Sequence, residues 1–180
     1  MNSPIQTIDK PLSPKGRFGR LAYAAWSFLS AIVFCIVIFI LAFIASLFSG
    51  NGSEFSDFPF IAILLFIILY IGFLYFSFVF TIRRLHDRNQ TGWLSLLIVV
   101  PLLNLIFLIY LFCAKGIEGE NLYGPSRSTA GWEKVLGWIY IILIPLLLVF
   151  GLAANAIPAY QDYIERSQQI QMEYQQYDAE

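Results

Sequence analysis

The stretch WLSLLIVVPLLNLIFLIYLFCA, residues 93–114, decides the fold of this chain. It is uncharged, and its length matches the roughly 20 residues that a helix needs to cross a bilayer. Pro101 lies near its middle, however, and disfavours helical geometry at Val100. The stretch is therefore predicted either to cross the membrane as one kinked helix or to enter and return as a helical hairpin.

Three further uncharged, apolar stretches are long enough to cross a membrane, at residues 21–53, 58–82 and 135–161. The 180 residues are 58% hydrophobic and 13% charged, whereas a soluble domain carries about 25% charged residues. An integral membrane protein is therefore predicted, with the lipid bilayer as its surroundings and no nucleic-acid partner. Cys35 and Cys113 lie inside apolar stretches without metal-ligating neighbours, and both thiols are expected to be buried.

The lysines and arginines predict the orientation, because cytoplasmic loops of membrane proteins are enriched in them. Four precede the first apolar stretch and three follow the second, whereas the loop between these stretches has none. The N-terminus and the cluster at residues 83–88 are thus predicted to be cytoplasmic. If residues 93–114 cross the membrane, eight of the eleven positive residues are cytoplasmic; if they return, ten are. We favour the re-entrant hairpin, which gives a periplasmic C-terminus, although such backbone must be shielded by protein.

The predicted fold is an all-α helical bundle in the membrane. It has three spanning helices plus a re-entrant helical hairpin, or four spanning helices, and a C-terminal amphipathic helix. Helices are expected at about 17–48, 58–87, 92–114, 132–157 and 159–178. The expected domains are a disordered polar leader (1–15), a membrane domain (16–130), an additional transmembrane helix (131–158) and an extramembrane helical tail (159–180).

Three polar motifs stand at the ends of the apolar stretches. The first, GRFGRLAYAAW at 16–26, has the spacing of side chains that anchor a helix at the headgroups. Its predicted membrane-entry anchors are Arg17, Arg20, Tyr23 and Trp26.

The second and third motifs are RRLHDRNQTGW (83–93) and GIEGENLYGP (116–125). No catalytic residue is assigned, because neither a nucleophile nor a second histidine stands near His86 in the sequence. No cofactor or metal is expected. If residues 93–114 return, the two motifs meet on one membrane face, where arginines and turn amides could bind an anionic headgroup. The residues of this predicted anion site are Arg83, Arg84, His86, Asp87, Arg88, Gly116, Gly119, Asn121 and Tyr123.

Together the three motifs resemble a bacterial inner-membrane family, domain of unknown function 805 (DUF805), over about residues 16–127. The matches are Gly16, Arg17, Arg20 and Tyr23, then residues 83–87 with Gly92 and Trp93, then Gly116, Gly119, Asn121, Tyr123, Gly124 and Pro125. Ala24 and Thr91 depart from the family's aromatic and serine. The resemblance implies a bacterial inner membrane location and a helical fold, and it implies no activity.

The stretch AIPAYQDYIERSQ, residues 156–168, resembles the point where the N-terminal helix of type IV pilins leaves the membrane. Upstream, the pilin processing site and its glutamate are replaced by Leu136-Gly137 and Ile141, so a processed pilin is not expected. On a helix, one face of the tail carries an apolar and aromatic stripe that could bind a pilin or another membrane helix. This tail stripe consists of Tyr160, Tyr163, Ile164, Ile170, Tyr174 and Tyr177.

The favoured function is a non-enzymatic inner-membrane interaction or assembly factor that engages an envelope or type IV pilus partner through residues 156–180. A small-solute carrier or channel is an alternative, supported by Asn104 and the break at Pro101. A second alternative is a membrane enzyme or a binder of anionic phospholipid headgroups at the arginine motif.

Overall fold

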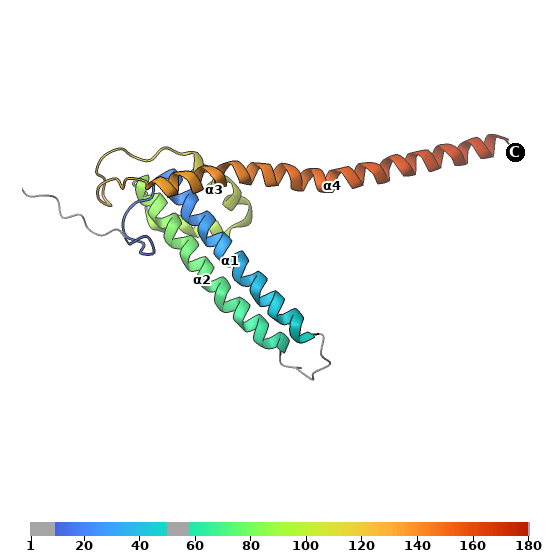
Figure 1. Ribbon diagram of the computed structural model, residues 1–180. Coiled ribbons are helices and arrows are strands. Elements are labelled where there is room, and N and C mark those ends of the chain that lie inside the picture. Colours follow the sequence, from blue (N-terminus) through green and yellow to red (C-terminus); the bar gives the residue numbers. More distant parts are fainter. Residues whose placement is uncertain (1–9, 50–57, 180) are drawn as a thin grey trace, which may run out of the picture. The chain divides into compact units, whose positions relative to one another are not determined.

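The computed structural model describes residues 10–49 and 58–179, and in this part of the chain the regular structure is helical. The elements are α1 (Arg20–Ser49), α2 (Phe58–Asp87), the 3₁₀ helix η1 (Gly92–Val99), α3 (Pro101–Cys113) and α4 (Gly131–Ala179), all drawn in Figure 1. Among the described residues, α1, α2 and α4 contain stretches long and apolar enough to cross a membrane. The predicted all-α membrane fold is confirmed.

α1 and α2 lie side by side as an antiparallel pair (Figure 1). Rings pack between them: those of Phe34 and Phe73 stack with their centroids 4.7 Å apart. The outward side chains are apolar and exposed, as for Phe39 at 72% and Ile63 at 58%. Such a surface matches a bilayer rather than water.

Both cysteines are exposed, so the expectation of buried thiols was wrong. Cys35 lies on α1 and Cys113 ends α3, both in apolar stretches. An apolar stretch indicates burial only where the surrounding solvent is water. On a membrane helix the same composition also covers the side that faces lipid.

The stretch at 93–114 folds back on itself. η1 and α3 are separated at Val100, whose backbone is extended (φ −89°, ψ 111°), and Pro101 begins α3. Proline is well tolerated there, because its missing N–H would have no intrahelical partner. The far end of the stretch returns to the end of α2: Arg84 Nε donates to the Leu111 carbonyl at 2.8 Å, and the Ile117 N–H to the Asp87 carbonyl at 3.0 Å. The single helix expected at 92–114 is therefore a hairpin of two, as in the re-entrant alternative.

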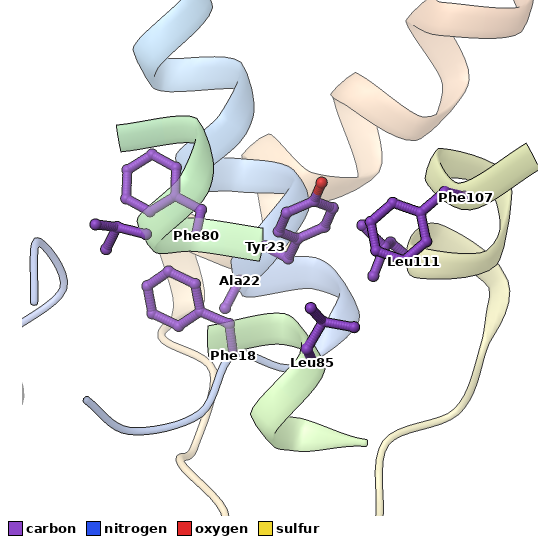
Figure 2. Packing of buried hydrophobic residues seen from close by; sticks show 8 residues of the cluster. Phe18, Ala22, Tyr23, Phe80, Leu85, Phe107 and Leu111 are labelled. Carbon is purple, nitrogen blue, oxygen red and sulfur yellow. The ribbon is translucent and has the colours of Figure 1, made fainter. Parts of the chain in front are cut away.

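A buried cluster joins α1, α2 and α3 at the end of the bundle where the polar motifs lie. Figure 2 shows Tyr23 of α1 pointing toward Phe107 and Leu111 of α3, while Phe18 faces Phe80 of α2. The rings of Phe18 and Phe80 are 6.0 Å apart. The members of the cluster are Phe18, Ala22, Tyr23, Val79, Phe80, Leu85, Phe107 and Leu111.

The chain divides into two units, one up to Tyr140 and one from Ile141 onward. The first turns of α4 belong to the first unit, and Gly137 lies so close to α1 that an added Cβ would be 2.5 Å from the Leu21 carbonyl oxygen. Helices were expected at 132–157 and 159–178, but α4 continues through Pro145 and Pro158 as one helix. The alanines around Pro158 favour helix, and prolines are tolerated within membrane-spanning helices. Between the two prolines, Asn155 Nδ2 donates to the Gly151 carbonyl at 2.7 Å.

The predicted disordered leader, residues 1–15, lies outside the described residues up to position 9. From Lys10 the chain makes a turn in which the Ser13 N–H donates to the Lys10 carbonyl at 2.9 Å. Arg83 of α2 holds this turn, donating from Nη1 to the carbonyls of Lys10 (2.8 Å) and Ser13 (3.2 Å). Residues 10–15 are therefore connected to the bundle.

Candidate functional site

Two arginines and one aspartate form a buried cluster at the end of the bundle. Arg17 lies three residues before the start of α1, while Arg84 and Asp87 lie in the last turn of α2. Asp87 Oδ1 accepts from Arg17 Nη2 at 3.1 Å, and Oδ2 accepts from Arg84 Nη1 at 2.6 Å. The arginine side chains are 0% exposed and the aspartate is 8% exposed. Because charges away from water must be paired, these three residues form one electrostatic unit, the arginine–aspartate cluster.

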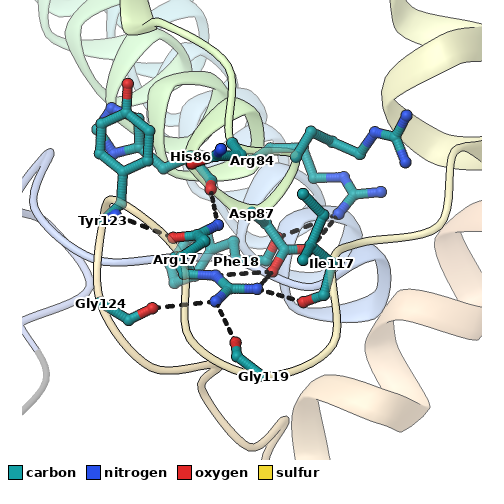
Figure 3. A network of polar contacts seen from close by, with 12 residues as sticks. Arg17, Phe18, Arg84, His86, Asp87, Ile117, Gly119, Tyr123 and Gly124 are labelled. Carbon is teal, nitrogen blue, oxygen red and sulfur yellow. Dashed lines mark hydrogen bonds and ion pairs between the residues drawn. The ribbon is translucent and has the colours of Figure 1, made fainter.

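Backbone carbonyls complete the hydrogen bonding of Arg17. Its Nη1 donates to Gly119 (2.6 Å) and Gly124 (3.0 Å), and its Nη2 donates to Ile117. Figure 3 shows these carbonyls converging on the guanidinium from the loop at 114–124, hereafter the carbonyl loop. Gly119 and Gly124 have positive φ (82° and 104°), which glycine adopts without strain. The glycines of the third motif thus let the loop turn around an arginine.

Arg84 is bonded in a similar way. Its Nε donates to the Leu111 carbonyl, its Nη1 to the Phe18 carbonyl at 3.3 Å and its Nη2 to the Ala114 carbonyl. These acceptors come from α3, from the entry to α1 and from the start of the carbonyl loop. One side chain on α2 therefore joins three segments that are far apart in the sequence.

Gly116 fits closely against the carboxylate. A Cβ at this position would stand 1.9 Å from Asp87 Oδ2, well inside contact distance. The neighbouring Ile117 N–H donates to the Asp87 carbonyl. Glycine is required here because of this close approach.

His86, the residue before Asp87, packs against the carbonyl loop. Its ring stacks on that of Tyr123, with centroids 3.8 Å apart and an interplanar angle of 7°. Asn121 Nδ2 donates to the His86 carbonyl at 2.8 Å, while Asn121 Oδ1 accepts from the Tyr123 N–H at 2.9 Å. The histidine and the asparagine thereby bind the carbonyl loop to α2. Within the described residues there is no group of three or more histidine, cysteine or acidic side chains that could hold a metal.

The other two arginines of the second motif point elsewhere. Arg83 binds the turn at residues 10–13, and its guanidinium lies 4.0 Å from the centre of the Phe18 ring. Arg88 donates from Nε to the Tyr110 hydroxyl at 3.2 Å and from Nη1 to the Lys115 carbonyl.

The structure thus brings together the members of the predicted anion site from both motifs, and it separates Arg83 and Arg88 from the arginine–aspartate cluster. Arg17, predicted only as an anchor, lies at the centre of that cluster. Anion binding remains a prediction. The two guanidiniums of the cluster already bond to protein oxygens.

The membrane-entry anchors occupy different surroundings. Arg17 is buried, whereas Arg20 is exposed and donates to the Cys113 carbonyl at 3.3 Å. Tyr23 is buried, with its hydroxyl 3.5 Å from Thr81 Oγ1. Trp26 donates from Nε1 to Glu133 Oε1 at 2.7 Å. Anchoring at the headgroups remains a prediction for the four residues.

A second buried polar cluster centres on Glu133, which lies outside the three polar motifs of the sequence. This fully buried carboxylate accepts from Trp26, from both terminal nitrogens of Arg127 (2.7 and 3.1 Å) and from the Ala130 N–H (2.9 Å). Glu133 lies three residues after Ala130, where a glutamate can reach back to cap the first turn of a helix. The sequence signal for this cluster is one acidic residue just before the apolar stretch 135–161.

The tail stripe is exposed along α4. Tyr160 is 65% exposed, Tyr163 70% and Ile170 52%, while Ile164 is partly buried. The side chains of Tyr174 and Tyr177 lie outside the described part of the structure. Binding of a partner by this stripe remains a prediction.

Fold and site together define a helical integral membrane protein with a buried arginine–aspartate cluster at the polar end of its helix bundle. Residues 11–125 match the family model described as "Protein of unknown function (DUF805)", so the chain belongs to this family. The match covers more than half of the chain and confirms the resemblance drawn from the three motifs.

Curated relatives include inner membrane proteins of Escherichia coli (strain K12). YhaH is 39% identical over 44 residues, and YhaI is 44% identical over 43 residues. Each alignment covers 24% of this chain and 36% of the relative, so the chain spans about a third of the length of the relatives it matches. Both carry the name inner membrane protein, which agrees with the apolar helices. No solved structure matches.

Proposed function

We propose that this protein is a non-enzymatic protein of the bacterial inner membrane that binds another envelope protein through residues 156–180. The bundle around the arginine–aspartate cluster supports the start of α4. The remainder of α4 provides the binding element.

The length and exposure of α4 carry this proposal. Its 49 residues correspond to about 74 Å of helix, whereas the hydrocarbon core is about 30 Å thick. The helix can therefore cross the membrane and still extend beyond it. In that extension Tyr160 and Tyr163 are more than half exposed. An aromatic face left open on an amphipathic helix is a surface that a partner helix can cover.

The resemblance of residues 156–168 to the pilin helix supports a type IV pilus component as the first partner to test. A pilin-like segment would pack beside another pilin-like segment through the same kind of apolar face. Such pairing needs a C-terminus outside the cytoplasm. Three crossings from a cytoplasmic N-terminus give that placement.

The test is site-specific photo-crosslinking in cells, with a photoreactive amino acid at Tyr163 or at Gln161. On a helix Gln161 lies on the face opposite the tail stripe, so it is the matched control. We expect a discrete adduct from position 163 that is absent from position 161. Equal adducts from both positions, or none from 163, would contradict the proposal. A pilin antibody on the adduct decides whether the partner is a pilus component.

The binding face is tested separately by charge. Tyr163→Asp with Ile170→Asp places two negative charges on the stripe, and Gln161→Asp with Gln169→Asp places the same charge on the opposite face. The first pair should abolish copurification of the crosslinked partner, and the second should leave it unchanged.

A small-solute carrier is a second candidate because of one observation. Asn104 Oδ1 of α3 is buried and has no hydrogen-bond partner among the described residues. A buried polar atom without a partner is costly unless it has a role, such as binding a permeant solute. Solute flux into liposomes should then fall with Asn104→Leu. Flux that is intact in this variant would remove the candidate.

A further inference from the structure

An open apolar groove of about 380 Å³ runs along the pair formed by α1 and α2. One wall is a single face of α1, whose lining residues recur three or four positions apart, and the other wall is formed by α2. Leu12 lies at one end of the groove. The lining residues include Leu12, Ser30, Phe34, Ile68, Gly72 and Phe80.

Gly72 leaves open space in the wall of the groove. An added Cβ at this position would meet no atom within 4 Å, so the glycine leaves open space beside α2. Around it the walls are rings, including Phe34 against Phe73. A groove of this composition accepts a hydrocarbon group.

The length of the groove matches one leaflet of a bilayer. From Phe80 to Ile68 the helix rises about 18 Å. Half of the hydrocarbon core is about 15 Å. The groove lies along helices apolar enough to cross the membrane, so an acyl chain of one leaflet would occupy it over its full length.

Within the turn that the structure describes, residues 10–15, the charged side chains at the Leu12 end are basic. Lys10 and Lys15 flank Leu12 in the turn that Arg83 holds, and both lysines are exposed. Among the described residues, the acid near Trp26 is Glu133, which bonds to Trp26 and Arg127. Lysines beside an apolar groove attract an anionic headgroup while its chain enters the groove.

We infer that the groove binds one anionic phospholipid of the bilayer, with an acyl chain along Gly72 and the headgroup phosphate at Lys10 and Lys15. This site is distinct from the arginine–aspartate cluster, whose cations pair with Asp87. It is also independent of any partner that binds α4.

Groove-filling variants test the inference. Gly72→Phe places a ring in the open space, and Ser30→Leu fills the groove from the α1 wall. Ile71→Phe adds a ring one residue away on a side chain that is 60% exposed and does not line the groove. Replacing glycine within a helix favours the helical state, so Gly72→Phe is expected to fold. Circular dichroism and thermal unfolding in detergent verify this for each variant.

The measurement is native mass spectrometry of the full chain released from nanodiscs that contain phosphatidylglycerol and phosphatidylcholine in equal amounts. We expect one retained phosphatidylglycerol on the parent chain and on Ile71→Phe, and none on Gly72→Phe or Ser30→Leu. Retention that is unchanged in both folded groove variants would overturn the inference. A lipid-free dimer that Gly72→Phe dissociates would overturn it too, because a second copy would then fill the groove.

The headgroup is tested with Lys10→Gln and Lys15→Gln. The usual attraction between one basic residue and an anionic surface corresponds to about a fivefold change in the binding constant. The preference for phosphatidylglycerol over phosphatidylcholine should therefore fall by roughly this factor per substitution. A preference that is undiminished in the double variant would overturn the assignment of the headgroup position.

Discussion

At the scale of single residues, Asp87 determines the stability of the polar end of the bundle. It is the shared acceptor of Arg17 and Arg84, whose side chains are fully buried. Asp87→Ala leaves both cations without a counter-charge, and breaking such a buried pair costs about 3–5 kcal/mol. We expect a loss of that size in the free energy of unfolding, measured by denaturant titration in detergent micelles.

The control for Asp87→Ala is Glu118→Gln. Glu118 pairs with Lys115 at 2.6 Å, but both side chains are mostly exposed, at 82% and 73%. Ion pairs in water contribute little to stability, so no measurable change is expected. If the two substitutions had equal effects, the burial of the arginine–aspartate cluster would not matter for stability.

Gly116 supports a second prediction at this scale. Gly116→Ala places a Cβ 1.9 Å from Asp87 Oδ2, so the carbonyl loop must move away from α2. Overpacking of this kind costs about 1–3 kcal/mol. Gly131→Ala is the matched control, because a Cβ there meets no atom within 4 Å. Thermal unfolding followed by circular dichroism should separate the two variants, and equal midpoints would contradict the close approach.

At the scale of elements, the sequence predicted the apolar helices well, because membrane helices need long uncharged stretches and this chain has them. The residues 58–87 expected for the second helix are those of α2. For residues 93–114 the lysines and arginines favoured a hairpin over a spanning helix. Pro101 alone could not decide between them, because proline also occurs in kinked spanning helices. Contacts between Arg84 and the far end of the stretch decide the geometry, and a sequence does not display such contacts.

The sequence predicted most residues of the candidate site, but it predicted their arrangement only in part. The sequence placed Asp87, Gly116 and Asn121 in one site, provided that residues 93–114 return. It treated Arg17 as a surface anchor, because an arginine before a membrane helix has the same local pattern whether it faces headgroups or a carboxylate. Glu133 was missed since its partners, Trp26 and Arg127, come from separate segments.

The contact of α4 with α1 gives a prediction at the element scale. Gly137 allows the helices to approach closely, and a Cβ there would meet the Leu21 backbone. Small residues permit such approach between membrane helices. Gly137→Ala should therefore destabilise the first unit by about 1–3 kcal/mol, as overpacking does. Gly151→Ala, where a Cβ meets no atom within 4 Å, should not. Unfolding in detergent compares them, and a neutral Gly137→Ala would contradict the close contact.

At the scale of the whole molecule, the direction in which the hairpin turns fixes the side on which the chain ends. Because Ile117 returns to Asp87, residues 88–92 and 115–128 are expected on the same membrane side as the end of α2. Ten of the eleven lysines and arginines then share that side, and Arg166 is the exception. The positive-inside rule therefore predicts that this side is cytoplasmic and that the tail is periplasmic.

Single cysteines test this topology in a chain that carries Cys35→Ser and Cys113→Ser. Ser128→Cys reports on the segment before α4, and Gln171→Cys reports on the tail; both positions are exposed. A membrane-impermeant maleimide added to spheroplasts should label position 171 and leave position 128 unlabelled until the membrane is permeabilised. With a cytoplasmic N-terminus, the reverse pattern is expected if residues 93–114 cross the membrane, because 128 would then be periplasmic and 171 cytoplasmic. That result would place the tail where no periplasmic partner could reach it, and it would contradict the proposed function together with the topology.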